Sequence, residues 1–515
     1  MRQKLTFALL IFFSINIFAQ SNELLKKYYD YSILFVKQKK YEQALDYALK
    51  TLDYNPENAN YNYITGVCYL NTDYQKHKAL PYLLKASQNI DKQAVAPNYR
   101  NETAPPDVLL YLSQAYYYNY KFFKAMESIK EFQKIAPNYS TTKLDNFRKK
   151  YITAARICNN HVHFETKHLS KTVNTKNSET NIASSVDEKT IIVTSIDSLG
   201  KTHITQYTKN EGKYNNPKNL DKILNPKNNA RVVALSANGD IAILEMKGDL
   251  YISENIGEWS MPEKLPQSIN SKYSEKSASL SIDGRTLYFS SDRPGGMGGF
   301  DIYYSELMPN NQWSKAKNIG SPINTKYDEN YCNIHADNIT LSYSSNQENT
   351  IGGYDLFFSE RNQNGTWSEP QNYGYPVNTV YDDANFVFTY DNRNAFFTTQ
   401  KDNSYGKKDI YKIKILAYQE NSSAVVKGVV KDAKGNVLSD KIIHLTNREN
   451  GKYIGQYKAG SNGVYTFILT PGSKYFISFD DESLNFSPKM ISVPSKASFS
   501  QIGKAIDLGT ITTIE

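Results

Sequence analysis

Three histidines near the middle of the chain are the first residues whose types could support chemistry. His161, His163 and His168 lie within eight residues of one another. Alternate side chains of a strand share a face, so His161 and His163 would lie together while His168 would point the other way. No carboxylate stands at a fixed spacing to complete the ligand set that zinc requires. The pattern therefore favours a polar edge strand over a metal site.

A glycine cluster invites comparison with a phosphate-binding loop. Gly295, Gly296, Gly298 and Gly299 match neither of the spacings typical of such loops, and a strand follows where a helix would be needed. Gly352 and Gly353 stand at the same place in a related segment, which indicates a repeated turn. We interpret these glycines as hairpin residues.

A series of aspartates could hold Ca²⁺ around a ring. Asp283, Asp337 and Asp391 do not form the interleaved acidic loop of a calcium site, so we expect them to cap turns. The pair Asp292 and Asp301 is the least unfavourable calcium candidate. The sequence thus predicts neither a metal nor a cofactor.

The sequence also contains none of the motifs that we associate with nucleophilic catalysis. The chain has no Gly-x-Ser-x-Gly elbow, no His-Glu-x-x-His motif and no cysteine with a plausibly paired histidine. Cys68, Cys158 and Cys332 are too dispersed for a disulfide framework and are expected in cores. We expect no catalytic residue and no enzymatic activity.

The size and the charge of the chain limit the number of domains and the class of partner. A chain of 515 residues exceeds a single core and predicts about three domains. The net charge of +8 is spread among interleaved lysines and acids, which argues against a nucleic-acid partner. Residues 1–19 have the charged start, apolar run and small terminal residue of a secretory signal. No later apolar run approaches about 18 residues, so we expect an exported protein without a transmembrane helix.

Residues 21–160 predict helices that repeat. Small residues such as Ala44 and Ala48 let two helices approach, aromatic residues such as Tyr41 fill the gap, and Pro56 ends the pair. This order resembles the tetratricopeptide (TPR) repeat, with two further copies and a lysine-rich final helix. A TPR resemblance implies a concave face that binds an extended peptide or a partner helix. The expected groove residues are Tyr29, Lys37, Tyr63, Tyr117 and Tyr118.

Residues 161–417 change to short alternating strands with a period of about 50 residues, which predicts a β-propeller. Three series mark the repeat: tryptophans that precede a serine, aspartates that open a strand, and Asp or Asn residues in the turn before the central strand. The members are Trp259, Trp313 and Trp367; Asp249, Asp301, Asp355 and Asp409; and Asp187, Asn238, Asp283, Asp337 and Asp391. The segment 281–306 resembles the TolB-type, WD-like propeller repeat.

The same pattern predicts how the ring closes. The segment from His161 resembles the outer strand of the other units, whereas the last unit, ending near Ile415, has no tryptophan strand. We therefore expect the N-terminal strand to complete the last blade, which removes open sheet edges. The count is five blades, with six as the alternative.

Residues 424–515 predict a small all-β sandwich after a polar linker. The glycine and aspartate spacing around Gly428, Val430 and Asp432, followed by Gly463 and Tyr465, resembles the carboxypeptidase regulatory-like module. That resemblance implies a transthyretin-like sandwich that carries no chemistry of its own.

The order of these parts resembles the OmpA-family envelope proteins of the Bacteroidetes, which include PorE of the type IX secretion machinery. Such proteins usually continue into a C-terminal OmpA-like domain that binds peptidoglycan, and this sequence ends at Glu515 where that domain would begin. The resemblance implies a non-enzymatic scaffold, periplasmic or associated with the outer membrane, that binds an outer-membrane barrel or secretion subunits and serves type IX secretion or gliding. The alternative is a small-ligand or glycan receptor that uses the propeller funnel.

Overall fold

The computed structural model describes residues 22–512 except 74, 94–97, 228, 363, 391–392, 402, 417–423, 433–434, 480–488 and 494–505. The predicted signal, residues 1–19, and Asp391 therefore lie outside the described residues. The chain divides into two compact units, Met1–Asn159 and Asn160–Glu515. This division falls one residue before the predicted end of the helical segment.

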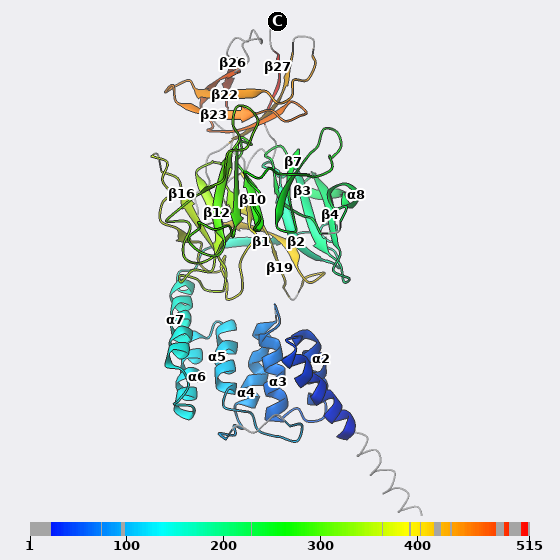
Figure 1. The fold of residues 1–515 in the computed structure, drawn as a ribbon, viewed down its shortest axis with the longest axis vertical. Helices are drawn as coiled ribbons and strands as arrows, with labels where there is room; N and C mark the ends of the chain where they lie inside the picture. Colours follow the sequence, from blue (N-terminus) through cyan, green and yellow to red (C-terminus); the bar gives the residue numbers. More distant parts are fainter. Residues whose placement is uncertain are drawn as a thin grey trace, which may run out of the picture. The chain divides into compact units, whose positions relative to one another are not determined.

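The first unit consists of helices, each packed beside the next in the chain (Figure 1). Gly66 shows how tightly two of them pack, because a Cβ atom there would overlap the side chain of Leu83. Asn58 and Ser140 cap two of the helices through their side chains. The helices span residues 22–37, α2 Tyr41–Leu52, α3 Ala59–Leu70, η1 Lys76–Lys78, α4 Ala79–Ala86, α5 Val108–Tyr118, α6 Phe122–Ile135 and α7 Thr141–Cys158.

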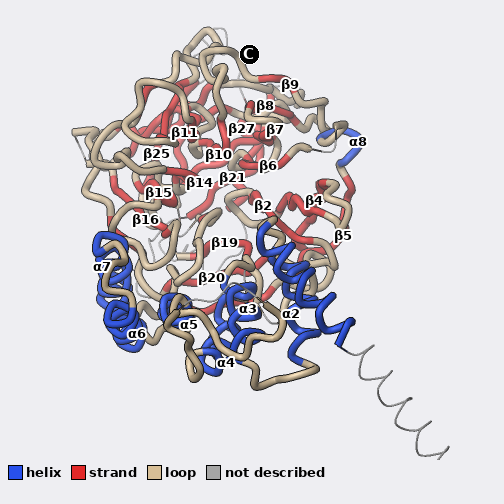
Figure 2. Tube along the Cα trace, turned by 60° about the horizontal axis from the view of Figure 1, so that its bottom comes forward, coloured by secondary structure: helices blue, strands red, loops and turns tan. Residues whose placement is uncertain are grey.

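The second unit begins with antiparallel sheets arranged as a β-propeller (Figure 2). Four of the sheets follow the chain order from the inner strand outward, and we name them blades 1 to 4. Blade 1 contains β2 Ser178–Ser184, β3 Thr190–Ile196, β4 Thr202–Asn210 and β5 Lys213–Asn219; blade 2 contains β6 Arg231–Leu235, β7 Ile241–Met246, β8 Asp249–Glu254 and β9 Glu263–Lys264. Blade 3 contains β10 Glu275–Leu280, β11 Thr286–Ser291, β12 Asp301–Glu306 and β13 Lys317–Asn318; blade 4 contains β14 Glu329–Ile334, β15 Thr340–Ser345, β16 Asp355–Glu360 and β17 Gln371–Asn372. A short helix, α8 Asp221–Leu224, follows blade 1.

A fifth four-stranded sheet, blade 5, joins the two ends of the ring. It contains β18 Val387–Phe388, β19 Asn394–Thr399 and β20 Asp409–Ile415, and its outer strand is β1 Phe164–His168. Phe164 pairs with Ile415 and His168 with Tyr411. The predicted completion of the last blade by the N-terminal strand is confirmed.

The sequence series mark equivalent places in the blades. Each aspartate of the series opens the third strand of its blade, and each tryptophan forms a bridge just after that strand. Four asparagines brace these third strands, because their side-chain oxygens accept backbone N–H bonds at 2.7–2.8 Å. They are Asn174, Asn270, Asn324 and Asn378.

Two further sheets follow the propeller. One contains β21 Ala424–Lys431, β24 Val464–Leu469 and β27 Ile506–Thr512; the other contains β22 Ile442–Asn447, β23 Tyr453–Lys458, β25 Lys474–Phe479 and β26 Lys489–Ser492. Gly428 lies against the ring of Tyr465 on the neighbouring strand, where a Cβ atom would overlap that ring. The two motif residues taken from the sequence thus pack against each other.

Candidate interaction surfaces

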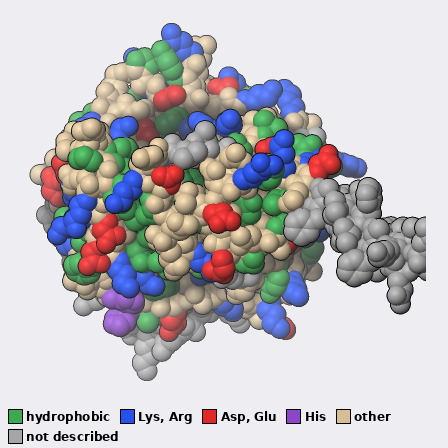
Figure 3. All heavy atoms as spheres, turned by 90° about the horizontal axis from the view of Figure 1, so that it is seen from below, with side chains coloured by type: hydrophobic (Ala, Val, Ile, Leu, Met, Phe, Trp, Pro, Cys, Tyr) green, Lys and Arg blue, Asp and Glu red, His purple; other side chains and the backbone are tan. Residues whose placement is uncertain are grey.

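The surface charge is mixed. Figure 3 shows one face of the molecule, on which Lys and Arg side chains are dispersed among Asp and Glu side chains. A protein that neutralises nucleic-acid phosphates needs a continuous basic stripe. The described residues on this face show no such stripe.

Two of the five predicted groove residues lie in the core of the helical unit. The rings of Tyr29 and Tyr117 are each only 2% exposed. Tyr29 accepts a hydrogen bond from Asn60 Nδ2 at 3.1 Å, and Tyr117 stacks on Tyr151 with ring centroids 5.2 Å apart. Burial raises the pKa of Tyr29 to about 12. The prediction that these two rings meet a partner is wrong, because each fills the gap to a neighbouring helix.

The other three predicted residues do reach the surface. Lys37 is exposed, while Tyr63 and Tyr118 are half-buried. Tyr118 lies under the ammonium group of Lys76 at 5.2 Å, and Tyr63 packs edge-on against Tyr111. Burial raises the pKa of Tyr63. Their role in binding stays a prediction.

The segment between α4 and α5 limits the room beside Tyr63. Asn60 Nδ2 donates to the carbonyl of Asn98 at 3.0 Å, and the hydroxyl of Tyr61 donates to the carbonyl of Tyr99 at 2.5 Å. A cavity of about 50 Å³, lined by Tyr63 and by residues of this segment, remains. This space is too small for a peptide side chain larger than a few atoms.

An aromatic surface that the sequence reasoning missed lies on the first helix pair. We call Tyr28, Tyr31, Phe35, Tyr47 and Tyr54 the first-pair aromatic surface. Tyr31 and Tyr47 have ring centroids 5.2 Å apart, and Tyr31 and Tyr54 are each 37% exposed. The spacing of three and four residues along the first helix was the available signal, since it places the rings on one face.

The funnel of the propeller is lined mainly by neutral side chains, both small and aromatic. Its cavity, of about 70 Å³, is bounded by the inner strands and includes Ala183, Val233, Ser277, Asn333 and Phe388. Of the described residues that line it, none is an aspartate or a glutamate, and Lys276 alone is a lysine or arginine. Such a wall offers few charge-assisted hydrogen bonds to a polar ligand.

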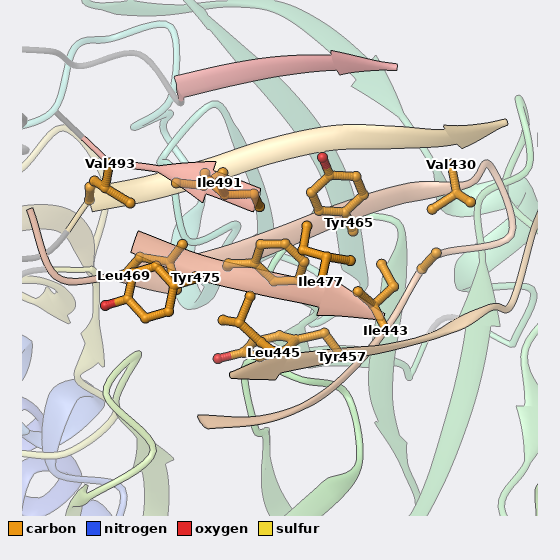
Figure 4. Close-up of a cluster of buried hydrophobic side chains, with 14 residues drawn as sticks. Val430, Ile443, Leu445, Tyr457, Tyr465, Leu469, Tyr475, Ile477, Ile491 and Val493 are labelled. Atoms are coloured by element: carbon orange, nitrogen blue, oxygen red, sulfur yellow. The ribbon is translucent and has the colours of Figure 1, made fainter. Parts of the chain in front are cut away.

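The two C-terminal sheets share one core (Figure 4), and turns of the propeller contact this part of the chain. Ile282, in the turn of blade 3, packs against that core. Lys427 Nζ lies 2.7 Å from Asp187 Oδ2, and Asn238 Nδ2 donates to the carbonyl of Val464 at 2.9 Å. Burial alone would raise the pKa of Asp187, but Lys427 and neighbouring hydrogen bonds hold it below its usual value. The sequence assigned these turns a local role only.

The predicted turn role of the aspartates is confirmed where the residues are described. Asp283 accepts the N–H of Arg285 at 3.0 Å, and Asp337 accepts the N–H of Thr340 at 2.8 Å. The calcium candidate Asp301 instead accepts bonds from the loop between β11 and β12, at Met297 N and Gly298 N. A Cβ atom at Gly298 would lie 1.8 Å from the carbonyl oxygen of Tyr327, so this loop needs glycine for its close approach.

The remaining candidates for chemistry also lie in structural contacts. His168 Nε2 lies 2.7 Å from Asp409 Oδ2, and its ring stacks on Tyr411. Cys68 and Cys332 are buried as expected, and burial raises the pKa of each thiol to about 12. Within the described part of the chain, no three His, Cys, Asp or Glu residues form a group that could hold a metal ion. Over the same residues, no helix has the length and apolarity needed to cross a membrane.

Comparison with known proteins gives partial likenesses. No family model and no curated protein matches the chain. Among solved structures it is similar to TolB from Acinetobacter baumannii, at 13% identity and a TM-score of 0.31, over 47% of this chain and 55% of that one. It is also similar to a putative TolB from Agrobacterium tumefaciens, at 13% identity and a TM-score of 0.30, over 50% and 91%. A periplasmic gluconolactonase from Pseudomonas aeruginosa follows, at 11% identity and a TM-score of 0.28, over 46% and 73%.

Proposed function

We propose that the protein is a non-enzymatic scaffold of the bacterial envelope that binds protein partners through its helical unit and its propeller. The order of its parts, which resembles that of the OmpA-family envelope proteins, supports a periplasmic place near the outer membrane. The proposed partners are an outer-membrane barrel or secretion subunits, and the proposed process is type IX secretion or gliding. We further propose that the blades form a five-bladed ring rather than a six-bladed one, and that the last two sheets form a single sandwich.

The first-pair aromatic surface carries this proposal. Tyrosine rings bury a large area at a low cost in side-chain entropy, which makes them frequent anchors of protein interfaces. Lys50 Nζ lies 5.0 Å from the Tyr47 ring and 5.4 Å from the Tyr28 ring, so the surface pairs apolar area with positive charge. A partner segment that carries apolar and acidic side chains would complement it.

Site-specific crosslinking in cells tests the proposal. A photoreactive residue at Tyr31, which is 37% exposed, should capture a discrete partner that mass spectrometry identifies as an envelope protein. The matched control is Phe123, an aromatic residue of α6 that is 77% exposed and lies outside this surface. Equal capture at both positions, or none at Tyr31, would contradict the proposal.

The funnel gives the receptor alternative mixed support. Acidic and aromatic side chains would favour it, and the described lining has no acidic residue but includes Tyr331, Phe386 and Phe388 beside its Ala, Val and Ser residues. A screen of glycans and small ligands against the full chain would revive the alternative if binding were lost on substitution of Ser277 or Asn333, two lining residues.

A further inference from the structure

Three blades carry a buried glutamate at the same position. Glu179, Glu275 and Glu329 lie on the first strands of blades 1, 3 and 4, and each pairs in register with a serine of the second strand. Each is 0% exposed, and each accepts bonds from the backbone and hydroxyl of a Thr or Ser four residues earlier. These shared bonds make the three sites directly comparable.

In blade 3 an arginine completes the site. Arg293 donates from its guanidinium to Glu275 Oε1 at 2.8 Å and to the carbonyl of Ile269 at 2.5 Å. The guanidinium lies 5.1 Å from the ring of Phe289 and 4.9 Å from that of Tyr303. The buried carboxylate thus has a cation that is itself held between aromatic faces.

Blade 1 keeps the acid and lacks the rest of this arrangement. Val193 and Thr205 face each other in register where blade 3 has Phe289 and Tyr303. The connection after the second strand is also shorter, with residues 197–201 in place of 292–300, so it brings no arginine. The guanidinium and both rings are therefore missing from the equivalent space.

That space is a cavity of about 220 Å³. Glu179, Val193 and Thr205 line it, together with Val173, the residue equivalent to Ile269. Glu179 Oε2 is buried without a hydrogen-bond partner, which is costly for a carboxylate. The site thus places a carboxylate that lacks one partner in the wall of an empty volume, and its Oε2 atom, which has almost no exposed surface, must turn toward that volume to meet a ligand.

The charges around the cavity favour a cation. His203 lines it and lies 2.8 Å from Asp221 and 3.2 Å from Asp197, whose carboxylates offset its charge. The hydrogen bond to Asp221 raises the pKa of His203. Burial is the main cause that raises the pKa of Glu179 to about 7, with a further contribution from the charge of Asp409. No lysine or arginine is among the described residues that line the cavity.

We infer that the blade 1 cavity binds a guanidinium group from outside the chain, with Glu179 as its carboxylate partner, in the place that Arg293 occupies in blade 3. The group belongs either to an arginine side chain of a protein partner or to a small guanidinium compound. Its planar fork matches a carboxylate plus a backbone carbonyl better than an ammonium group does. The inference does not depend on the partner proposed for the helical unit.

Calorimetric titration of the full chain with Nα-acetyl-arginine amide tests the inference. We expect saturable binding at one site, and binding of the neutral citrulline analogue that is weaker by about tenfold or more. Glu179→Gln should weaken arginine binding by at least about tenfold, because the amide lacks the charge that strengthens the bond. Lys213→Gln, an exposed change on the outer strand of the same blade, is the control and should leave binding unchanged.

A second variant keeps the test valid if Glu179→Gln does not fold. Val193→Phe supplies the ring that Phe289 presents to the guanidinium in blade 3, and should therefore tighten arginine binding several-fold while Glu179 remains. Equal binding of arginine and citrulline analogues, no saturable binding, or binding unchanged in both variants would overturn the inference. A five-residue peptide with a central arginine then assigns the source: tighter binding than the amide indicates a protein partner, and equal binding indicates a small compound.

Discussion

Blades 1 and 3 place the same acid at the same register position and surround it differently. In blade 3 the chain itself supplies a guanidinium, and both Glu275 and its serine partner are saturated with hydrogen bonds. In blade 1 Glu179 has bonds only on its Oε1 atom, and the volume beside it is open. In a repeated fold, the blade that lacks a contact present in its equivalents is therefore the one in which to look for a binding site.

The largest effect is expected when this contact is removed from blade 3. Arg293→Ala leaves Glu275 buried without its cation, which should lower the free energy of unfolding by about 4 kcal/mol. Denaturant unfolding of the propeller transition measures it. Millimolar guanidinium should stabilise this variant more than it stabilises the parent, because it can fill two sites in the variant and only the blade 1 cavity in the parent. A variant as stable as the parent would show that the two blades do not differ as described.

A pH dependence of stability should come next. Burial raises the pKa of Glu179 and of Glu329 to about 7, so the folded state holds protons that the unfolded chain releases near pH 4.5. The free energy of unfolding should therefore fall as the pH rises from about 5 to about 7, by on the order of 3 kcal/mol for each group. Melting curves across this range check the sign. Glu179→Gln should remove its share of the slope, and an unchanged slope would contradict the burial argument.

The affinity for a guanidinium ligand should also depend on whether Glu179 is protonated. Because a guanidinium group needs the ionised carboxylate, its binding should tighten about tenfold between pH 6 and pH 8, given a pKa of Glu179 of about 7. Loss of charge from His203, flanked by Asp197 and Asp221, acts in the same direction. Titrations at three pH values measure the change, and weaker binding at the higher pH would be incompatible with Glu179 as the partner.

Smaller effects separate packing from binding. Val193→Phe fills part of the blade 1 cavity and should raise the free energy of unfolding by about 1 kcal/mol, because it buries apolar area in an existing space. Tyr31→Ala in the first-pair aromatic surface should lower it by about 1 kcal/mol or less, because the side chain is 37% exposed but packs on Tyr47. Thermal melts of both variants provide the check, and a large loss for Tyr31→Ala would mean that this ring is structural.

The sequence predicted the repeats well because each residue of a repeat has equivalents in the other repeats, which show where it lies in the fold. The aspartates that open the third strands and the N-terminal strand at His161 could be placed by comparison with equivalent segments. The residues that line the helical groove could not be predicted by this comparison. Tyr29 and Tyr117 follow the repeat spacing, but whether such a ring faces solvent or the next helix depends on how closely neighbouring helices pack.

The blade 1 site was beyond sequence reasoning for a related reason. Glu179 is the same residue type as Glu275 and Glu329, and only the pairing register of the strands shows that Val193 and Thr205 stand where blade 3 has two aromatic rings. A cavity forms where side chains from several strands are together too small to fill the space between them. It can therefore be recognised only when the positions of those strands are known.

The most direct test of the central claim is a crystal structure of the full chain grown with Nα-acetyl-arginine amide. We predict a planar guanidinium in the blade 1 cavity, within hydrogen-bond distance of the Glu179 carboxylate, with Arg293 in place in blade 3. A cavity that contains only ordered water, or a ligand bound elsewhere, would contradict it.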